Sequence, residues 1–128
     1  MKALVIDDQP HYLPIGDLRE FGPEGVTYTV IDHPDKLEGV DYSEFDLVIL
    51  DHRMPVKLGD EVAHDIRNAG HTMPIFRISS FREGDYPEGC YYVERKALGL
   101  SRFEYLLMFT RGEIDEDTMW TKINTWGW

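Results

Sequence analysis

The sequence predicts an α/β fold built on a parallel sheet, and three observations lead to this prediction. Five short apolar runs recur at intervals that suit strands alternating with helices. Two of them, residues 3–6 and 47–50, are continuous and contain β-branched residues, which is typical of central strands covered on both faces. Alternating strands and helices give parallel strands joined by right-handed crossovers. Central strands in the first and third places favour the order 2-1-3-4-5, that of a flavodoxin-like three-layer sandwich with a five-stranded sheet.

The remaining three strands are predicted from shorter signals. Residues 26–31 alternate in polarity, as an edge strand does. Residues 74–79 and 91–94 supply the fourth and fifth strands. In such a sheet, ligands bind at the carboxyl ends of the strands, near the switch point between the first and third strands.

Proline residues and the small number of residues between strands limit the length of several predicted helices. Pro10 and Pro14 restrict the first crossover to a brief helix over residues 15–21. The segments 33–44 and 81–89 each have room for only a short helix.

Two further helices carry clearer signals. The apolar residues at 62, 66 and 69 share one helical face, and Gly70 follows as a C-terminal cap. Ser101 and Glu104 fit a capping box at the start of a last helix, which Gly112 closes.

Composition limits the size and the partners of the protein. The chain has 128 residues, enough for one ordinary domain, which we place at residues 1–112. Its formal net charge of -11 disfavours nucleic acid and anionic membrane surfaces as partners. We see no signal peptide and no stretch that could span a bilayer. The single cysteine, Cys90, favours a reducing compartment, so we expect a cytoplasmic protein.

Residues 113–128 are predicted to form an acidic linker and a tryptophan-rich C-terminal tail. All three tryptophans of the chain lie in its last nine residues, and Met119 and Ile123 add to the apolar surface of this tail. So much apolar surface is a liability when exposed. We expect this tail either to fold back on the domain, which we slightly favour, or to dock on another chain; whether the protein forms a homodimer stays open.

Acidic residues end the two strands that meet at the switch point. The first strand ends in Asp7 and Asp8, and the third ends in Asp51. Like charges this close raise one another's pKa unless a cation neutralises them. Mg²⁺ would do so with carboxylates, a carbonyl and waters. A strand-end aspartate also commonly caps the next helix, but three at paired strand ends favour a metal site.

A hydroxyl and a cation are expected at the same edge of the sheet. Ser79 ends the fourth strand, and Arg95 and Lys96 follow the fifth. A carboxylate can attack a phosphoryl group to give an acyl phosphate. That transfer needs a metal ion, a cation and a hydrogen-bond donor around the phosphoryl oxygens, and the strand order brings such groups together.

The chain resembles a response-regulator receiver domain of two-component signalling over residues 1–112. The resemblance rests on VIDD at 5–8, LVILDHRMP at 47–55, GDE at 59–61, MPIFRISS at 73–80, and Gly89-Cys90 followed by Lys96. It implies that Asp51 accepts the phosphoryl group. It also implies Mg²⁺ as cofactor, held by Asp7, Asp8, Asp51 and the backbone carbonyl of Arg53, with Ser79 as the switch hydroxyl and Lys96 as the phosphate-side cation.

The chain departs from the family pattern near the fifth strand. The family lysine is normally followed by proline, whereas Ala97 follows Lys96. The family's switch aromatic lies three residues before that lysine; the same count reaches Val93 from Lys96 but Tyr92 from Arg95. We favour Lys96 as the cation, and Arg95 stays open as the alternative.

The resemblance implies a phosphorylation-controlled switch, which we expect to be a stand-alone receiver. Its partners would be a histidine kinase or phosphotransfer protein and an unidentified downstream protein, and its chemistry would be limited to its own phosphorylation and dephosphorylation. The alternative is a phosphorylation-independent pseudo-receiver that acts as a protein-interaction module. A flavin site is disfavoured because Asp7 and Asp8 would repel its phosphate, and a haloacid-dehalogenase-type phosphatase is disfavoured because Arg53 stands where its second aspartate would be.

Overall fold

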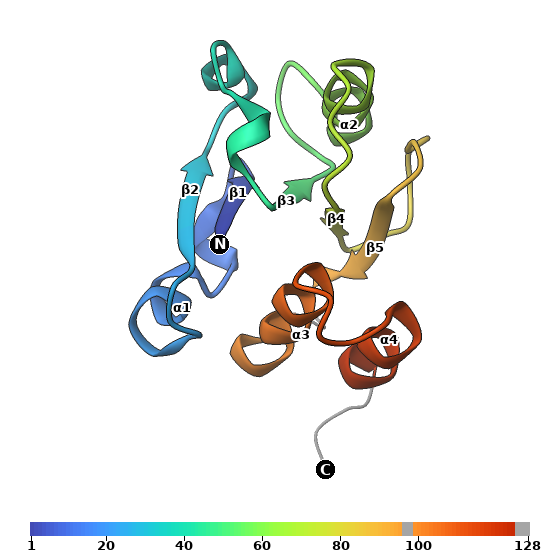
Figure 1. Ribbon diagram of the computed structural model, residues 1–128. Helices are drawn as coiled ribbons and strands as arrows, with labels where there is room; N and C mark the ends of the chain where they lie inside the picture. Colours follow the sequence, from blue (N-terminus) through green and yellow to red (C-terminus); the bar gives the residue numbers. More distant parts are fainter. Residues whose placement is uncertain (96–98, 125–128) are drawn as a thin grey trace.

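The computed structural model describes residues 1–95 and 99–124 and contains one parallel sheet. Its five strands lie in the order β2-β1-β3-β4-β5, as predicted (Figure 1). Their bounds are β1 Lys2–Ile6, β2 Thr27–Ile31, β3 Leu47–Asp51, β4 Ile75–Ser79 and β5 Cys90–Glu94. Each lies within one residue of the range predicted from its apolar run.

The strand register aligns the carboxyl ends of the two central strands. Ala3 pairs with Leu47 and Ile6 with Leu50, so Asp7 follows β1 beside the end of β3. Asp51 in turn pairs with Ile78, one residue before the end of β4. The parallel ladders therefore bring the ends of β1, β3 and β4 to one edge of the sheet.

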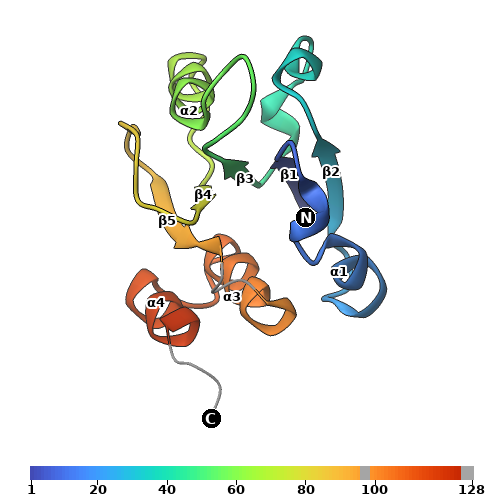
Figure 2. The ribbon, with the colours of Figure 1, turned by 180° about the vertical axis from the view of Figure 1, so that it is seen from behind.

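Helices cover both faces of this sheet (Figures 1 and 2). One face packs against α1 Ile15–Phe21, α3 Leu100–Thr110 and α4 Glu116–Asn124. The other packs against α2 Gly59–Asn68, which buries Val62, Ala63 and Ile66. Side chains of β1 and β3 contribute to the hydrophobic clusters on both faces of the sheet, because these two strands are buried on both sides.

The segment 33–44 holds only short helices, as predicted: two 3-10 helices, η2 Pro34–Leu37 and η3 Tyr42–Glu44, separated by Gly39 at a φ of 79°. Two other local predictions need correction. The segment 81–89 has no helix, because Gly84 and Gly89 adopt left-handed φ values and Pro87 lacks a backbone donor. The last predicted helix begins two residues earlier than its predicted capping box, with Gly99 in place of Ser101 at the N-cap position.

Residues 116–124 form a helix packed on the domain. Asp115 caps it, since its Oδ1 atom accepts a 2.8 Å hydrogen bond from the Thr118 amide. Met119 and Ile123 are buried in the same cluster as α1 and α3. This part of the predicted tail therefore folds back on the domain, whereas Trp126 and Trp128 lie outside the described residues.

Within those residues, every helix is too short or too polar to cross a lipid bilayer.

Candidate functional site

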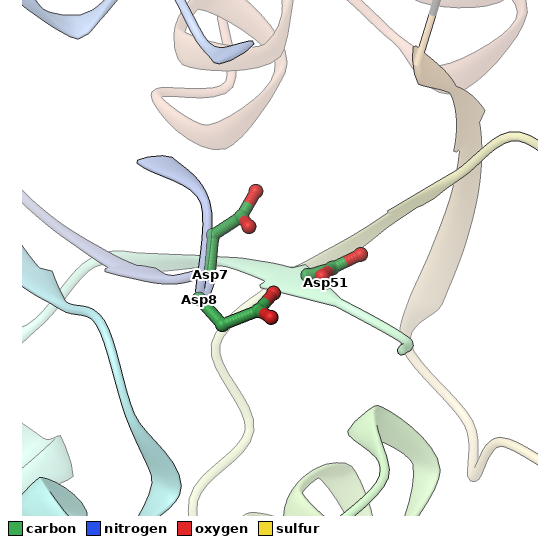
Figure 3. A group of neighbouring side chains, drawn as sticks. All are labelled: Asp7, Asp8 and Asp51. Carbon is green, nitrogen blue, oxygen red and sulfur yellow. The ribbon is translucent and has the colours of Figure 1, made fainter. Parts of the chain in front are cut away.

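Three carboxylates converge at the switch point, as the strand order predicts. Asp7 and Asp8 follow β1 directly, and Asp51 is the last residue of β3. One oxygen from each lies within 4.8 Å of the others. Figure 3 shows the three side chains as neighbours, with Asp7 and Asp8 on one stretch of chain and Asp51 beside them. All donors are oxygens from carboxylates, which is the ligand set that a hard divalent cation prefers.

Backbone hydrogen bonds hold this group in place. The Asp7 amide donates to the Ile31 carbonyl of β2 at 3.1 Å, which fixes the residue beyond the end of its strand. Oδ1 of Asp7 accepts from the Gln9 amide at 2.9 Å. Asp7 is 1% exposed and Asp51 is 7% exposed, so both are removed from bulk water.

Arg95 supplies the cation that these buried acids need. Its Nη2 atom donates to Oδ1 of Asp51 at 2.9 Å, and its Nη1 atom donates to Oδ2 of Asp7 at 3.4 Å. The sequence-based choice between two neighbouring cations favoured Lys96, which lies outside the described residues. In the described part of the chain, Arg95 contacts the carboxylate pair directly.

Burial raises the pKa of Asp51 to about 7, with the neighbouring Asp7 charge as the second cause. Arg95 opposes this shift, because its positive charge favours the ionised carboxylate. A hydrogen bond with Asp8 and the Asp8 charge raise the pKa further. Asp51 therefore keeps its proton to a higher pH than an ordinary aspartate does, because Arg95 does not fully offset burial and the nearby carboxylates.

A hollow of about 510 Å³ opens beside these side chains. Its lining also includes Gln9, Tyr12, Arg53, Ser79, Ser80 and Phe81. Ser79, at the end of β4, is 8% exposed, and its Oγ atom accepts a 3.3 Å hydrogen bond from the Phe81 amide. The predicted hydroxyl and the predicted metal-binding residues thus line one space.

The loop after Asp51 is packed tightly against the strand that carries it. The Gly59 amide donates to the His52 carbonyl at 2.8 Å. A Cβ atom at Gly59 would collide with the Asp51 carbonyl oxygen and lie 2.8 Å from the His52 Cα atom. Within this loop, Val56 has a φ of 69°, a conformation that β-branched residues rarely adopt. Strain of this kind is concentrated near functional sites.

Residues 80–89 cover this loop in place of a helix. His52 Nδ1 lies 2.7 Å from the Tyr86 hydroxyl, and Arg53 forms a two-pronged ion pair with Glu83 at 2.7 and 2.9 Å. The Arg77 guanidinium lies 4.3 Å from the centre of the Tyr86 ring and donates to the Glu83 carbonyl at 2.9 Å. These contacts tie the two residues after Asp51 to the segment that follows β4.

The sequence-based reasoning missed these contacts, although Arg77 carried a signal. It is a charged residue within an otherwise apolar strand, and such a residue needs a partner when it is covered.

Comparison with solved structures identifies the fold. No protein-family model matches the sequence, and a search of curated proteins finds no match. Receiver domains do match the structure. A response-regulator receiver domain from Francisella aligns at a TM-score of 0.66 and 16% identity, covering 88% of this chain and 97% of its own. The chain has the fold of a response-regulator receiver domain.

Two further receiver structures agree with that assignment. TrrA of Thermotoga maritima, solved in complex with Mg²⁺-BeF, has a TM-score of 0.64 and 24% identity and covers 88% of this chain and 98% of its own. The BeF3-activated receiver domain of RstA from Klebsiella pneumoniae has a TM-score of 0.65 and 21% identity, covering 87% and 99%. The receiver fold is therefore confirmed.

Proposed function

We propose that this protein is a phosphorylation-controlled switch that accepts a phosphoryl group on Asp51 with the help of Mg²⁺. One observation carries the proposal: Asp7, Asp8, Asp51 and Arg95 meet in a single hollow at the carboxyl edge of a receiver-fold sheet. A solvated or helix-capping role would not require three carboxylates and a guanidinium to share one space.

The donor set fits a magnesium ion. Asp7, Asp8 and Asp51 would hold it through carboxylate oxygens, and the Arg53 backbone carbonyl is the remaining protein ligand that we propose. The Mg²⁺-BeF complex of the TrrA neighbour supports this choice. When bound, the ion would neutralise negative charge on the phosphoryl oxygens.

The chain's own residues would then carry the transfer. An Asp51 carboxylate oxygen attacks phosphorus, the bond from phosphorus to the leaving nitrogen or oxygen of the donor breaks, and the leaving group keeps that bond's electron pair. Arg95 is already within hydrogen-bond distance of Asp51, so we place it at the phosphoryl oxygens. Lys96 stays a candidate for the same role. Ser79 would donate its hydroxyl to the new phosphoryl group.

The phosphoryl donor would be a histidine kinase or a phosphotransfer protein, or a small acyl phosphate in vitro. Phosphorylation adds about -1.5 to -2 units of charge beside Ser79. Tyr92 donates from its hydroxyl to the Ser79 carbonyl at 3.2 Å. A movement of Ser79 toward the phosphoryl group would therefore displace the Tyr92 side chain on β5. That displacement would change the surface offered to a downstream partner. A cytoplasmic location belongs to this proposal.

Mass spectrometry tests the proposal directly. The purified chain is incubated with Mg²⁺ and acetyl phosphate, beside Asp51→Asn as the matched variant. We expect a mass gain of one phosphoryl group in the native chain, lost when the metal is chelated, and none in the variant. A gain in both proteins, or in neither, contradicts the assignment of Asp51.

A second candidate function is an interaction module that is never phosphorylated. It is favoured by Arg95, which already pairs with Asp51 and Asp7 as a structural cation would. Calorimetric titration separates the two functions. The absence of Mg²⁺ binding together with the absence of phosphoryl uptake would favour the interaction module.

A further inference from the structure

The loop over residues 52–58, between β3 and α2, carries the Arg53 carbonyl that we propose as a metal ligand. The backbone of this loop does little to fix its position. Among residues 1–95 and 99–124, the backbone hydrogen bonds of residues 53–58 stay inside the loop or reach only the start of α2. Val56, with a φ of 69°, adds strain. The position of the loop must therefore be set by side-chain contacts.

Two buried side chains of the loop make such contacts. Met54 is 7% exposed and packs in the hydrophobic cluster shared with the sheet and α2. His52 is 6% exposed, and its Nδ1 atom lies 2.7 Å from the hydroxyl of Tyr86, in the segment between β4 and β5. Removing one partner of a buried hydrogen bond is costly, because the group left behind has no partner in its place. The contact with Tyr86 is therefore a strong restraint on the loop.

The Tyr86 hydroxyl lies close to both ends of the loop. It contacts His52 at the start, and it would lie 2.7 Å from a Cβ atom placed at Gly59, the first residue of α2. The same Cβ atom would collide with the Asp51 carbonyl oxygen. One hydroxyl group thus lies beside His52 and Gly59, next to the strand end that carries Asp51.

Tyr86 is itself held against β4. The Arg77 guanidinium lies 4.3 Å from the centre of the Tyr86 ring and donates a 2.9 Å hydrogen bond to the Glu83 carbonyl. The chain around Tyr86 is also close to the loop. A Cβ atom at Gly84 would lie 2.6 Å from Cε1 of His52 and 2.9 Å from Cε2 of Tyr86. The segment therefore has a fixed place from which Tyr86 can hold the loop.

A second contact of the same segment is weaker. Glu83 accepts two hydrogen bonds from the Arg53 guanidinium, at 2.7 and 2.9 Å. The Arg53 side chain is 71% exposed, and an ion pair in contact with water stabilises a protein only slightly. Of the two contacts, the buried one between His52 and Tyr86 therefore contributes more to fixing the loop.

We propose that Tyr86 is a positioning residue for the metal site, because through His52 it keeps the Arg53 backbone at the acidic hollow. Arg53 lines that hollow together with the three aspartates. The inference rests on the proposed function, since it concerns the same site. A ligand that is in place before the metal arrives avoids the free-energy cost of ordering the loop on binding. The affinity for Mg²⁺ should therefore depend on the hydroxyl of a residue that lies outside the proposed ligand set.

Removing this hydroxyl alone tests the proposal. Tyr86→Phe keeps the ring and loses the contact with His52. In calorimetric titration we expect the variant to bind Mg²⁺ about three- to tenfold more weakly than the native chain does, because the loop must be ordered on binding. At saturating Mg²⁺, phosphoryl uptake on Asp51 from acetyl phosphate should reach the native extent.

Tyr42→Phe is the matched control. Tyr42 is another half-buried tyrosine packed against the same hydrophobic cluster, and its ring centre lies 5.8 Å from that of His71, as the Tyr86 ring centre lies 5.6 Å from that of His52. Because Tyr42 is remote from the loop in this network of contacts, Tyr42→Phe should bind Mg²⁺ as the native chain does.

Hydrogen–deuterium exchange of the metal-free protein gives a readout that does not require Mg²⁺. In Tyr86→Phe, the amides of residues 53–58 should exchange about fivefold faster than in the native chain, because a loop that opens more often exposes its amides. Peptides from β3 and α2 should exchange at the native rate. A merely structural role of Tyr86 would instead accelerate exchange in these peptides as well.

The outcomes separate this inference from the proposed function. An unchanged Mg²⁺ affinity in Tyr86→Phe overturns the inference while leaving the proposed function intact. Weaker binding with unchanged exchange at residues 53–58, or with faster exchange throughout the protein, also overturns it. A native chain that binds no Mg²⁺ is a different result, because it contradicts the proposed function and removes the metal ligand that Tyr86 would position.

Discussion

The guanidinium of Arg95 donates a 2.9 Å hydrogen bond to Oδ1 of Asp51, although the two residues lie 44 positions apart in the chain. The same guanidinium contacts Asp7 at 3.4 Å. A cation that binds two carboxylates of a metal site competes with the metal for them. The pair therefore links metal binding to the state of the Arg95 side chain.

Replacing Arg95 tests this competition. We expect Arg95→Ala to bind Mg²⁺ about three- to tenfold more tightly than the native chain, because the freed carboxylates need another cation. Phosphoryl uptake from acetyl phosphate should nevertheless become slower, because the variant lacks a cation beside the phosphoryl oxygens. Calorimetric titration measures the affinity. Arg111→Ala, which removes a surface partner of Glu113, is the control. An affinity that stays equal or falls in Arg95→Ala would refute the competition.

The raised pKa of Asp51 makes the stability of the metal-free protein depend on pH. Its pKa is about 7 in the folded protein, against 3.8 for an unperturbed aspartate, so the folded state binds the proton more tightly than the unfolded chain does. This contribution to stability is complete below pH 3.8 and is lost as the pH rises through about 7. The side chain introduced by Asp51→Asn cannot ionise, so at pH 7.5 the free energy of unfolding of that variant should be higher than that of the native chain by about 4 kcal/mol, the equivalent of the pKa difference between about 7 and 3.8.

Urea unfolding in a chelating buffer at several pH values measures this effect. The relevant quantity is the difference between Asp51→Asn and the native chain, since the other acids titrate in both. The difference should grow between pH 4 and pH 7 and then level off. A difference that is constant with pH would show that the Asp51 pKa is not raised.

Gly59 allows the start of α2 to touch the end of β3. We expect Gly59→Ala to lower the free energy of unfolding by about 1–3 kcal/mol, because the new methyl group would meet backbone atoms of Asp51 and His52. Gly16→Ala is the matched control on α1, where a Cβ atom meets nothing within 4 Å. There the better helix propensity of alanine should stabilise the protein by about 0.5 kcal/mol. Equal effects of the two substitutions would contradict the close approach at Gly59.

Met119 tests whether α4 belongs to the same folding unit as the sheet. It is fully buried in the cluster shared with α1 and α3. Met119→Ala should cost about 2–5 kcal/mol in a single cooperative unfolding transition, whereas Lys122→Ala on the exposed side of α4 should cost little. A loss confined to a separate, early transition would instead support a boundary at residue 112.

Much of the fold was predictable because it depends on local hydrophobic patterns. The runs at 3–6 and 47–50 became β1 and β3, and the acids that follow them met because parallel strands end at one edge. The helix over 15–21 was predicted to the residue, since Leu18 and Ile15 are buried and Gly22 ends it.

The errors have a common physical cause: where the local sequence preference is weak, contacts with distant parts of the chain determine the conformation. At residues 81–89, the contacts of Tyr86 and Glu83 with His52 and Arg53, from another part of the chain, act together with the left-handed Gly84 and Gly89 to replace the predicted short helix. The choice between Arg95 and Lys96 depended on a one-residue shift at the end of β5, which no periodicity specifies. The α4 helix did have a local signal that was overlooked: Asp115 in a capping position before Met119 and Ile123 at helical spacing.

The Arg95 contact also sets the electrical balance of the acidic hollow. When Asp51 has lost its proton, as it does above a pH of about 7 or on binding a metal ion, three ionised carboxylates and one guanidinium leave a charge of -2, from -3 and +1. One divalent ion brings this space to electroneutrality, whereas a sodium or potassium ion leaves it negative. A phosphoryl group arriving with about -1.5 to -2 units of charge then makes it negative again. The site would thus alternate between neutral and anionic states while the net charge of the surrounding surface stays the same.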